Sequence, residues 1–199
     1  MSEQTPQASR TPVTTGLDQH SEPIAHKKVY SWAFFDWALQ PFNTVILTFV
    51  FTAMYLVTET FVDPEVLAGL VAELGADAGR DAALAPLTSG FGLVTTIAGV
   101  CIALVAPILG QWADATGKRK AWVFWSSLAL LATMGALFFV QAEPRFFWVG
   151  VSLIALGTVL NQVSETNYNA MIVSVATPST VGRVSGLGWG LGYSGGVVA

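Results

Sequence analysis

Long uncharged stretches that are rich in apolar residues alternate with short polar segments along this chain of 199 residues. A helix needs about 20 mostly apolar residues to cross the roughly 30 Å hydrocarbon core of a bilayer. The pattern therefore predicts four complete membrane-spanning helices, and a fifth that is still uncharged where the sequence stops. The expected spans are residues 30–61, 84–112, 121–142, 145–176 and, cut short, 183–199.

The polar segments suggest how the spans are connected. In residues 1–28, apolar residues do not recur at a regular spacing, so this segment is expected to form a disordered cytoplasmic tail. Residues 29–199 are then a partial transmembrane domain. Asp63-Pro64 is a favourable helix start, an acidic cap followed by proline in the first turn. Between the first two spans we therefore expect a short amphipathic helix at the membrane surface, with apolar positions Leu67, Leu70, Val71 and Leu74 and an end at Gly75.

Composition supports a membrane protein and excludes several other classes. Charged residues make up 11% of the chain, against about 25% in an ordinary soluble domain. The single cysteine, Cys101, excludes an internal disulfide, and His20 and His26 are too isolated for a metal site. The sequence has no basic patch with interleaved aromatic residues, the pattern that is typical of nucleic-acid binding. We expect an all-α, polytopic protein whose main partner is the lipid bilayer, with no cofactor and no metal.

The distribution of Lys and Arg predicts the orientation. Six basic residues flank one side of the expected spans, against Arg80 and Arg145 on the other. Cytoplasmic loops carry the excess of Lys and Arg in membrane proteins. We therefore expect a plasma-membrane protein with its N-terminus in the cytoplasm, and the basic residues on that side are Lys27, Lys28, Lys118, Arg119, Lys120 and Arg183.

The segment between the second and third spans carries an unusual combination of residues. Asp114 ends the second span, where the helix dipole disfavours a negative charge, so another group must stabilise it. Gly110 permits close approach of a neighbouring helix, Gly117 permits a tight reversal, and the basic run Lys118-Arg119-Lys120 follows. These residues describe either a cytoplasmic latch between helices or a basic loop that sets topology beside an incidental aspartate.

This stretch resembles the loop 2–3 signature of the major facilitator superfamily, in which the loop stabilises one gating state. Residues 31–38 (Ser-Trp-Ala-Phe-Phe-Asp-Trp-Ala), with Pro41 to Ile46, look like the first helix of the "unknown major facilitator" branch, which is related to autophagy-linked vacuolar effluxers. Residues 167–171, 182–186 and Gly192-Tyr193 resemble the span 4–5 region of the same branch. The sequence departs from the commoner pattern at Leu39-Gln40, where Asn-Ser is usual.

The resemblance implies an incomplete N-terminal half of a major facilitator fold, whose missing partner is the C-terminal half of the transporter. In that superfamily, about twelve helices form two six-helix halves with the solute cavity between them. The vacuolar relatives are linked to amino-acid efflux. The function expected is therefore transport of a small solute, with amino acids as one candidate, by alternating access and secondary active coupling. The alternative is a non-transporting truncated membrane fragment that lacks the second half.

Polar residues inside the spans are candidates for solute or ion binding because burying them in lipid is costly. Two stripes at helical spacing are expected to line the cavity, with Asp36 or Glu165 as the carboxylate that responds to a proton or cation. The alternatives are a helix cap or ion-pair partner for Asp36, and a structural ion pair for Glu165. The stripes are Asp36, Gln40 and Asn43 on the first span, and Asn161, Glu165, Tyr168 and Asn169 on the fourth.

Other features have simpler interpretations. The glycines of the fifth span, Gly186, Gly190, Gly192 and Gly196 among them, suit tight helix packing. Tryptophans near span ends, including Trp32, are typical of interface anchors, and Pro41 and Pro107 are expected to bend their helices. No Ser/His/Asp set, metal cluster or phosphate loop lies in the spans, and a channel filter is also missing, so neither an enzyme nor a channel is expected.

Overall fold

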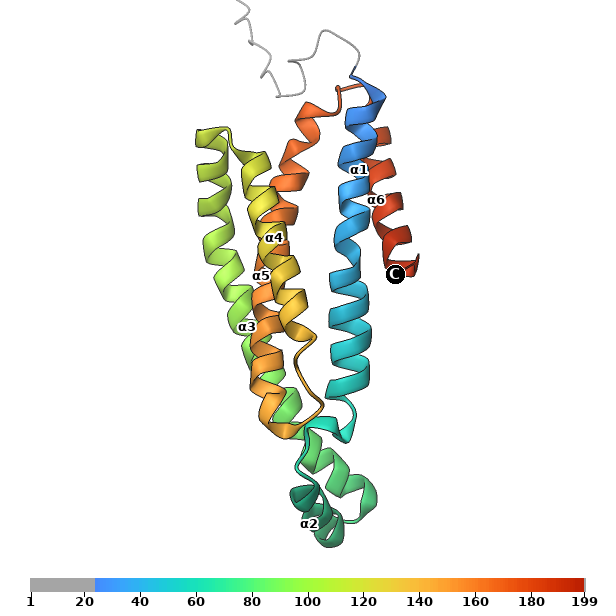
Figure 1. Cartoon of the computed structure of the whole chain (residues 1–199), viewed down its shortest axis with the longest axis vertical. Helices are drawn as coiled ribbons and strands as arrows, with labels where there is room; N and C mark the ends of the chain where they lie inside the picture. The colour runs from blue at the N-terminus through green and yellow to red at the C-terminus, as the bar shows by residue number, and fades with distance from the viewer. Residues whose placement is uncertain (1–23, 199) are drawn as a thin grey trace, which may run out of the picture.

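The computed structural model describes residues 24–198, and every regular element among them is helical (Figure 1). Four helical segments in this part of the chain are long and apolar enough to cross a membrane, His26–Leu56, Ala76–Thr116, Arg119–Leu137 and Pro144–Ser174. The predicted all-α, multi-span fold is confirmed. The expected N-terminal tail lies outside the described residues up to residue 23, whereas residues 26–28 form the first turn of a helix.

The first span consists of two helical segments that meet at Pro41. Helix α1 (His26–Pro41) passes directly into η2 (Phe42–Leu56), which has the wider π winding. Because proline has no N–H to donate to the carbonyl four residues back, Pro41 interrupts the α-helical hydrogen-bond pattern at the point where the winding changes. The Thr48 hydroxyl donates to the Asn43 carbonyl at 2.8 Å, and Thr52 donates to Leu47 at 2.8 Å, each five residues back, as the wider winding permits.

A helical hairpin projects from one end of the molecule (Figure 1). After a short turn η3 (Glu59–Phe61), the predicted helix is present as α2 (Pro64–Leu74), and the Asp63 carboxylate accepts from the Glu65 N–H at 2.9 Å. Gly75, with φ of 87°, reverses the chain into α3 (Ala76–Thr116). α3 therefore begins eight residues before the expected span and continues without a break through Pro86 and Pro107.

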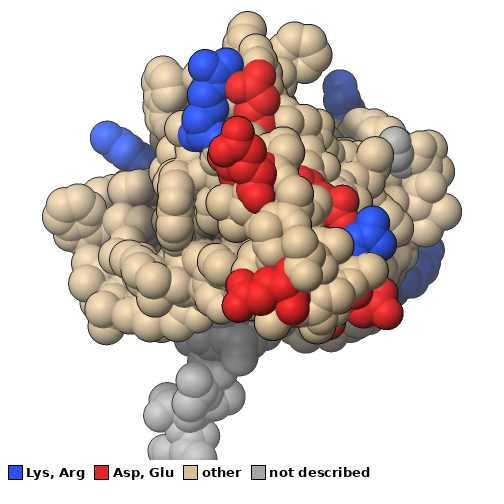
Figure 2. All heavy atoms as spheres, turned by 90° about the horizontal axis from the view of Figure 1, so that it is seen from below, with Lys and Arg blue, Asp and Glu red and all other residues tan. Residues whose placement is uncertain are grey.

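The two ends of the molecule differ in charge. The first turns of α1 and α6 and the α3–α4 turn all lie at the end opposite the hairpin (Figure 1), and these segments carry the basic residues counted above. Figure 2 shows the hairpin end with acidic side chains spread across it. The acidic residues in the segments at this end are Glu59, Asp63, Glu65, Glu73, Asp77, Asp81 and Glu143.

The remaining helices complete two packed groups. α4 (Arg119–Leu137) ends five residues before the expected boundary, and η4 (Pro144–Phe146) leads into α5 (Phe147–Ala170), which packs against α3 and α4. After η5 (Met171–Ser174), helix α6 (Val181–Val198) returns alongside α1 (Figure 1). Two buried apolar clusters join these groups, one around Trp32 and Tyr168, the other around Phe51 and Phe147.

Glycines on α5 allow the first span to approach this helix closely. A methyl group added at Gly157 would lie 2.5 Å from the ring of Phe42, and one at Gly150 would lie 3.0 Å from Phe51. Phe42 is consequently 1% exposed. Large apolar side chains such as Leu104 and Phe138 instead lie on the outer surface, as expected of helices whose outer faces contact lipid.

Candidate functional site

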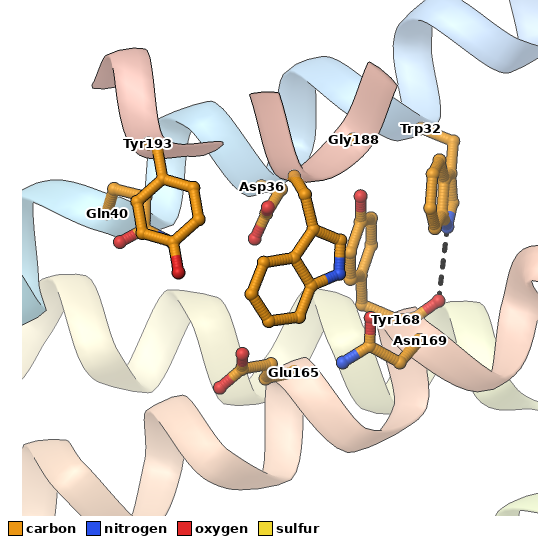
Figure 3. Close-up of a pocket in the computed structure, with 9 residues that line it drawn as sticks. Trp32, Asp36, Gln40, Glu165, Tyr168, Asn169, Gly188 and Tyr193 are labelled. Atoms are coloured by element: carbon orange, nitrogen blue, oxygen red, sulfur yellow. Dashed lines mark hydrogen bonds between the residues drawn. The ribbon is translucent and has the colours of Figure 1, made fainter. Parts of the chain in front are cut away.

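A cavity of about 250 Å³ lies between α1, α5 and α6 (Figure 3). Each helix contributes three residues, which lie four positions apart on α1 and within about one and a half turns of one another on α5 and α6. From α1 come Trp32, Asp36 and Gln40; from α5, Glu165, Tyr168 and Asn169; and from α6, Gly188, Trp189 and Tyr193.

The structure brings five of the seven candidate binding residues together at this cavity, namely Asp36, Gln40, Glu165, Tyr168 and Asn169. The other two do not line it. Asn43 belongs to the π-wound segment, where its carbonyl accepts from Thr48. Asn161 lies one turn before Glu165 and is 5% exposed, and its side-chain oxygen has no hydrogen-bond partner among the described residues.

Two carboxylates from different helices point into the same cavity. Figure 3 shows Asp36 on α1 and Glu165 on α5 directed toward the space between them, with the Tyr193 hydroxyl beside them. No Lys, Arg or His is among the lining residues. The ion pairs in the described part of the chain are Glu59–Arg80, Asp114–Arg119 and Glu143–Arg145, so neither cavity carboxylate takes part in one.

This arrangement bears on the alternatives for Asp36. The residue lies well inside α1, which begins at His26, so it is not at a helix end and does not act as a cap. Within the described residues it forms no ion pair with Lys27, Lys28 or Arg183. An acidic side chain inside a membrane helix is costly without a partner. Asp36 instead lines the cavity, where the Gln40 side chain is its hydrogen-bond partner.

Trp32 contributes to the site in a way that the sequence did not indicate. Instead of anchoring at an interface, the side chain is 7% exposed, and its indole N–H donates to the Tyr168 carbonyl at 3.1 Å. The indole and phenol rings stack with centroids 4.6 Å apart and an interplanar angle of 11°. The i, i+4, i+8 spacing of Trp32, Asp36 and Gln40 was the available signal, because it places all three on one helix face.

Tyr168 leaves a polar atom unsatisfied at the cavity. Its side chain is 4% exposed, and its hydroxyl has no hydrogen-bond partner among the described residues. A buried hydroxyl without a partner costs roughly 1–3 kcal/mol. The same side chain lines the cavity and is stacked in place by Trp32. The hydroxyl is therefore a buried polar atom at the cavity wall whose hydrogen-bonding capacity is unused among the described residues.

Glycines bring α6 close to the α1 side of the cavity. A methyl group at Gly188 would lie 2.8 Å from the Trp32 ring, and one at Gly192 would run into the Asp36 carboxylate. Gly196 faces Thr44 in the same way, at 2.6 Å from its hydroxyl oxygen. Of the four predicted packing glycines, Gly192 and Gly196 thus lie against the first span, whereas Gly186 and Gly190 have nothing within 4 Å of an added methyl group.

Trp189 and Tyr193 also line the cavity but were not among the sequence candidates. Their rings lie 5.8 Å apart on α6. An aromatic residue in a membrane helix is ordinarily explained by lipid or interface contact, so the sequence offered no signal beyond their helical spacing. Gly188 was missed as a lining residue for a related reason, since a residue without a side chain shows no polarity pattern.

Arg119 connects the α3–α4 turn to the end of α5. Its guanidinium pairs with the Asp114 carboxylate, with Nε and Oδ1 2.6 Å apart, and a second nitrogen donates to the Ala170 carbonyl at 2.6 Å. The last carbonyls of a helix lack intrahelical donors, and a cation stabilises this end. Gly117, with φ of 62°, makes the reversal, while Gly110 has open space beside it and Lys118 and Lys120 are exposed.

We expect Arg119→Ala to loosen the C-terminal turn of α5, because it removes a charged donor from the Ala170 carbonyl. The Arg119 side chain is 28% exposed, so solvent screening should reduce the loss below the usual range of roughly 1.5–3 kcal/mol for a charged hydrogen bond, to about 1 kcal/mol. Amide exchange over residues 168–174 should accelerate about fivefold. Lys120→Ala, in the same basic run but exposed and outside this contact, is the matched control; equal exchange in both variants would contradict the assignment.

The sequence matches the family model described as Major Facilitator Superfamily over residues 4–199. It is similar to a protein of Bacillus subtilis (strain 168) described as "Uncharacterized MFS-type transporter YxiO", with 27% identity over 173 residues. The alignment covers 86% of this chain and 36% of the Bacillus protein. No solved structure matches the sequence.

Proposed function

Because the chain belongs to the major facilitator superfamily, a family of membrane transporters, we propose that it acts in secondary active transport of a small solute by alternating access. The chain spans 36% of the length of the curated relative it matches. The proposal therefore concerns the transporter as a whole, in which this chain supplies an N-terminal part and a C-terminal half supplies the other wall of the cavity. Solute and coupling ion would both act at the cavity between α1, α5 and α6.

The observation that carries this proposal is the pair Asp36 and Glu165. Two acidic side chains on separate helices face one cavity, and neither has an ion-pair partner in the described part of the chain. Ionisable residues inside membrane helices mark substrate or ion pathways when they face a cavity. One carboxylate can bind the coupling proton or cation, and the other can bind the solute or remain as its counter-charge.

The Arg119 contact suggests how the site is linked to a gate. Arg119 holds the carbonyl of Ala170, which directly follows Tyr168 and Asn169 of the cavity wall. Tyr168 is in turn bonded through its own carbonyl to Trp32 on α1. A change at the α3–α4 turn would therefore be transmitted to the cavity through the end of α5. In this proposal the Asp114–Arg119 pair stabilises one of the two access states and is released in the other.

The proposed location is the plasma membrane with the N-terminus in the cytoplasm. The support is the charge difference between the two ends of the molecule, because the end that carries most of the basic residues is the cytoplasmic one in most membrane proteins. On this assignment Asp36 and Glu165 lie in the cytoplasmic half of their helices, and the acidic hairpin of α2 and α3 lies outside the cell.

The second candidate function is that of a membrane fragment that does not transport, because a solute cavity enclosed by two halves needs both. The coding sequence downstream of Ala199 discriminates between the two. A reading frame that continues through seven or more apolar spans supports the transporter, whereas a stop codon at that point supports the fragment.

Transport itself is tested in proteoliposomes that contain the complete protein. Vesicles preloaded with an unlabelled solute should accumulate the labelled form by counterflow, which requires binding and alternating access but no gradient of a coupling ion. A panel that begins with neutral amino acids tests the class linked to the resembling vacuolar proteins. If no labelled amino acid of this panel accumulated, the amino-acid assignment would be wrong. If no solute of any class tested accumulated, transport would be rejected.

A further inference from the structure

The cavity between α1, α5 and α6 carries a carboxylate on two of its three helices and no basic side chain among its lining residues. Asp36 and Glu165 line it, and no cationic side chain does. The two amide side chains of the lining, Gln40 and Asn169, are uncharged. An anionic solute entering this space would meet like charges and lose its hydration shell without compensation. The charges of the described residues therefore favour a cation.

A second observation, independent of the carboxylates, also points to a ligand. The Tyr168 hydroxyl is buried, has no hydrogen-bond partner, and belongs to a side chain that lines the same cavity. Its ring is stacked against Trp32, so the hydroxyl cannot easily turn toward solvent. A hydroxyl can accept a hydrogen bond. An ammonium group donates up to three, so a single ammonium can bond a carboxylate and this oxygen together.

Aromatic rings complete the lining. Trp32 is held between Tyr168 and Gly188 and presents little of its face. Trp189 and Tyr193 also line the cavity, and the described residues leave most of their surface uncovered, at 61% and 67% exposed. A cation within about 6 Å of an aromatic face is attracted by the ring quadrupole. The same rings contact an apolar body equally well, which favours an organic cation over a bare metal ion.

We propose that this cavity recognises a small organic cation, a protonated amine joined to an apolar or aromatic body. The inference rests on the proposed function, since it takes the solute site of the transporter to be this cavity and names the class of solute. The ammonium group lies between the carboxylates and the Tyr168 hydroxyl, and the body lies against Trp189 and Tyr193. This chain encloses about 250 Å³ of the cavity, somewhat less than the roughly 300–1,000 Å³ of pockets for drug-sized ligands, which is room for a small amine before the C-terminal half adds its wall.

The test compares three probes of nearly equal shape and different charge. They are the 2-phenylethylammonium ion, the neutral 2-phenylethanol and the phenylacetate anion. Binding to the complete protein in lipid nanodiscs is measured by titration calorimetry at neutral pH. We expect the cation to bind at least tenfold more tightly than the alcohol, and the anion to bind most weakly. Equal or tighter binding of the alcohol or the anion, or no binding of the cation, would overturn the inference.

Variants test whether the preference for the cation over the alcohol depends on the two carboxylates. In the double variant Asp36→Asn/Glu165→Gln, which keeps the shape of both side chains, the ratio of cation to alcohol affinity should fall to near one. Retained affinity for the alcohol reports that the cavity is still formed. Glu73→Gln, an exposed acid on α2 outside the cavity, should leave the ratio unchanged. A tenfold preference that persists in the double variant would place cation binding elsewhere and reject this site.

The outcome separates this inference from the proposed function. Cation-selective binding without counterflow of any solute would reject transport and leave the cation site in place. Counterflow of neutral or anionic solutes by a protein that shows no preference for the ammonium probe would reject the cation site and leave transport in place.

Discussion

Uptake driven by an ion gradient should fall at least tenfold in the variants Asp36→Asn and Glu165→Gln of the complete protein. Each change removes one negative charge from the cavity and preserves the shape of the side chain. Two unit charges about 4 Å apart interact by roughly 4 kcal/mol at an effective dielectric constant near 20. Because each 1.4 kcal/mol corresponds to a factor of ten, a tenfold loss is a conservative expectation. The measurement is initial uptake into proteoliposomes with an imposed ion gradient.

Equilibrium exchange of solute, measured in the same vesicles, distinguishes the roles of the two carboxylates. A variant that loses gradient-driven uptake but retains exchange has lost the coupling site, whereas a variant that loses both has lost the counter-charge of the solute. Glu73→Gln is the matched control, because this acid lies on α2 at the far end of the molecule. If gradient-driven uptake were unchanged in both cavity variants, the assignment of coupling to this pair would be wrong.

The second large effect is expected in the packing of α6 against α1. A methyl group at Gly195 would lie 2.5 Å from the Trp37 carbonyl oxygen, and a backbone oxygen inside a helix cannot move aside as a side chain can. Gly195→Ala should therefore destabilise the fold by about 1–3 kcal/mol, the usual range for overpacking a core. Denaturant titration in mixed micelles, followed by far-UV circular dichroism, measures the change.

Gly190→Ala, in the same helix, is the control with the opposite expected sign. Nothing lies within 4 Å of the added methyl group, and alanine is favoured over glycine inside a helix by up to about 1 kcal/mol. This variant should be as stable as the parent chain or more stable. Equal destabilisation by the two substitutions would mean that α6 does not present its Gly195 face to α1.

Features that depend on short stretches of chain were predictable from the sequence. The spans follow from length and hydropathy, and all four complete spans are present as helices of suitable length. The helix after Asp63 follows from its cap and Pro64, and its end follows from Gly75. The boundaries were less predictable. α3 starts eight residues early because residues 76–83, though partly polar, can extend a helix beyond the bilayer and pack against α2.

Pattern alone also found most of the polar residues at the candidate site, because an acid or amide inside a membrane helix is conspicuous. Asp36, Gln40, Glu165, Tyr168 and Asn169 were selected as candidates in this way, and all five line the cavity. Asn43 and Asn161 were selected by the same reasoning and lie elsewhere. Polarity and helical spacing specify a helix face only approximately, and the change to π winding after Pro41 rotates the later residues of the first span away from the earlier ones.

The sequence by itself thus determined that this is a helical membrane protein, which residues are costly in lipid, and, apart from the early start of α3, approximately where its helices begin and end. Only the tertiary structure decided that Asp36 and Glu165 share a cavity, that Trp32 stacks on Tyr168 instead of anchoring at an interface, and that Gly192 rather than Gly190 faces the first span. Helix formation depends on residues within a few turns, whereas these contacts depend on the rotation and approach of helices far apart in the chain, which no local pattern encodes.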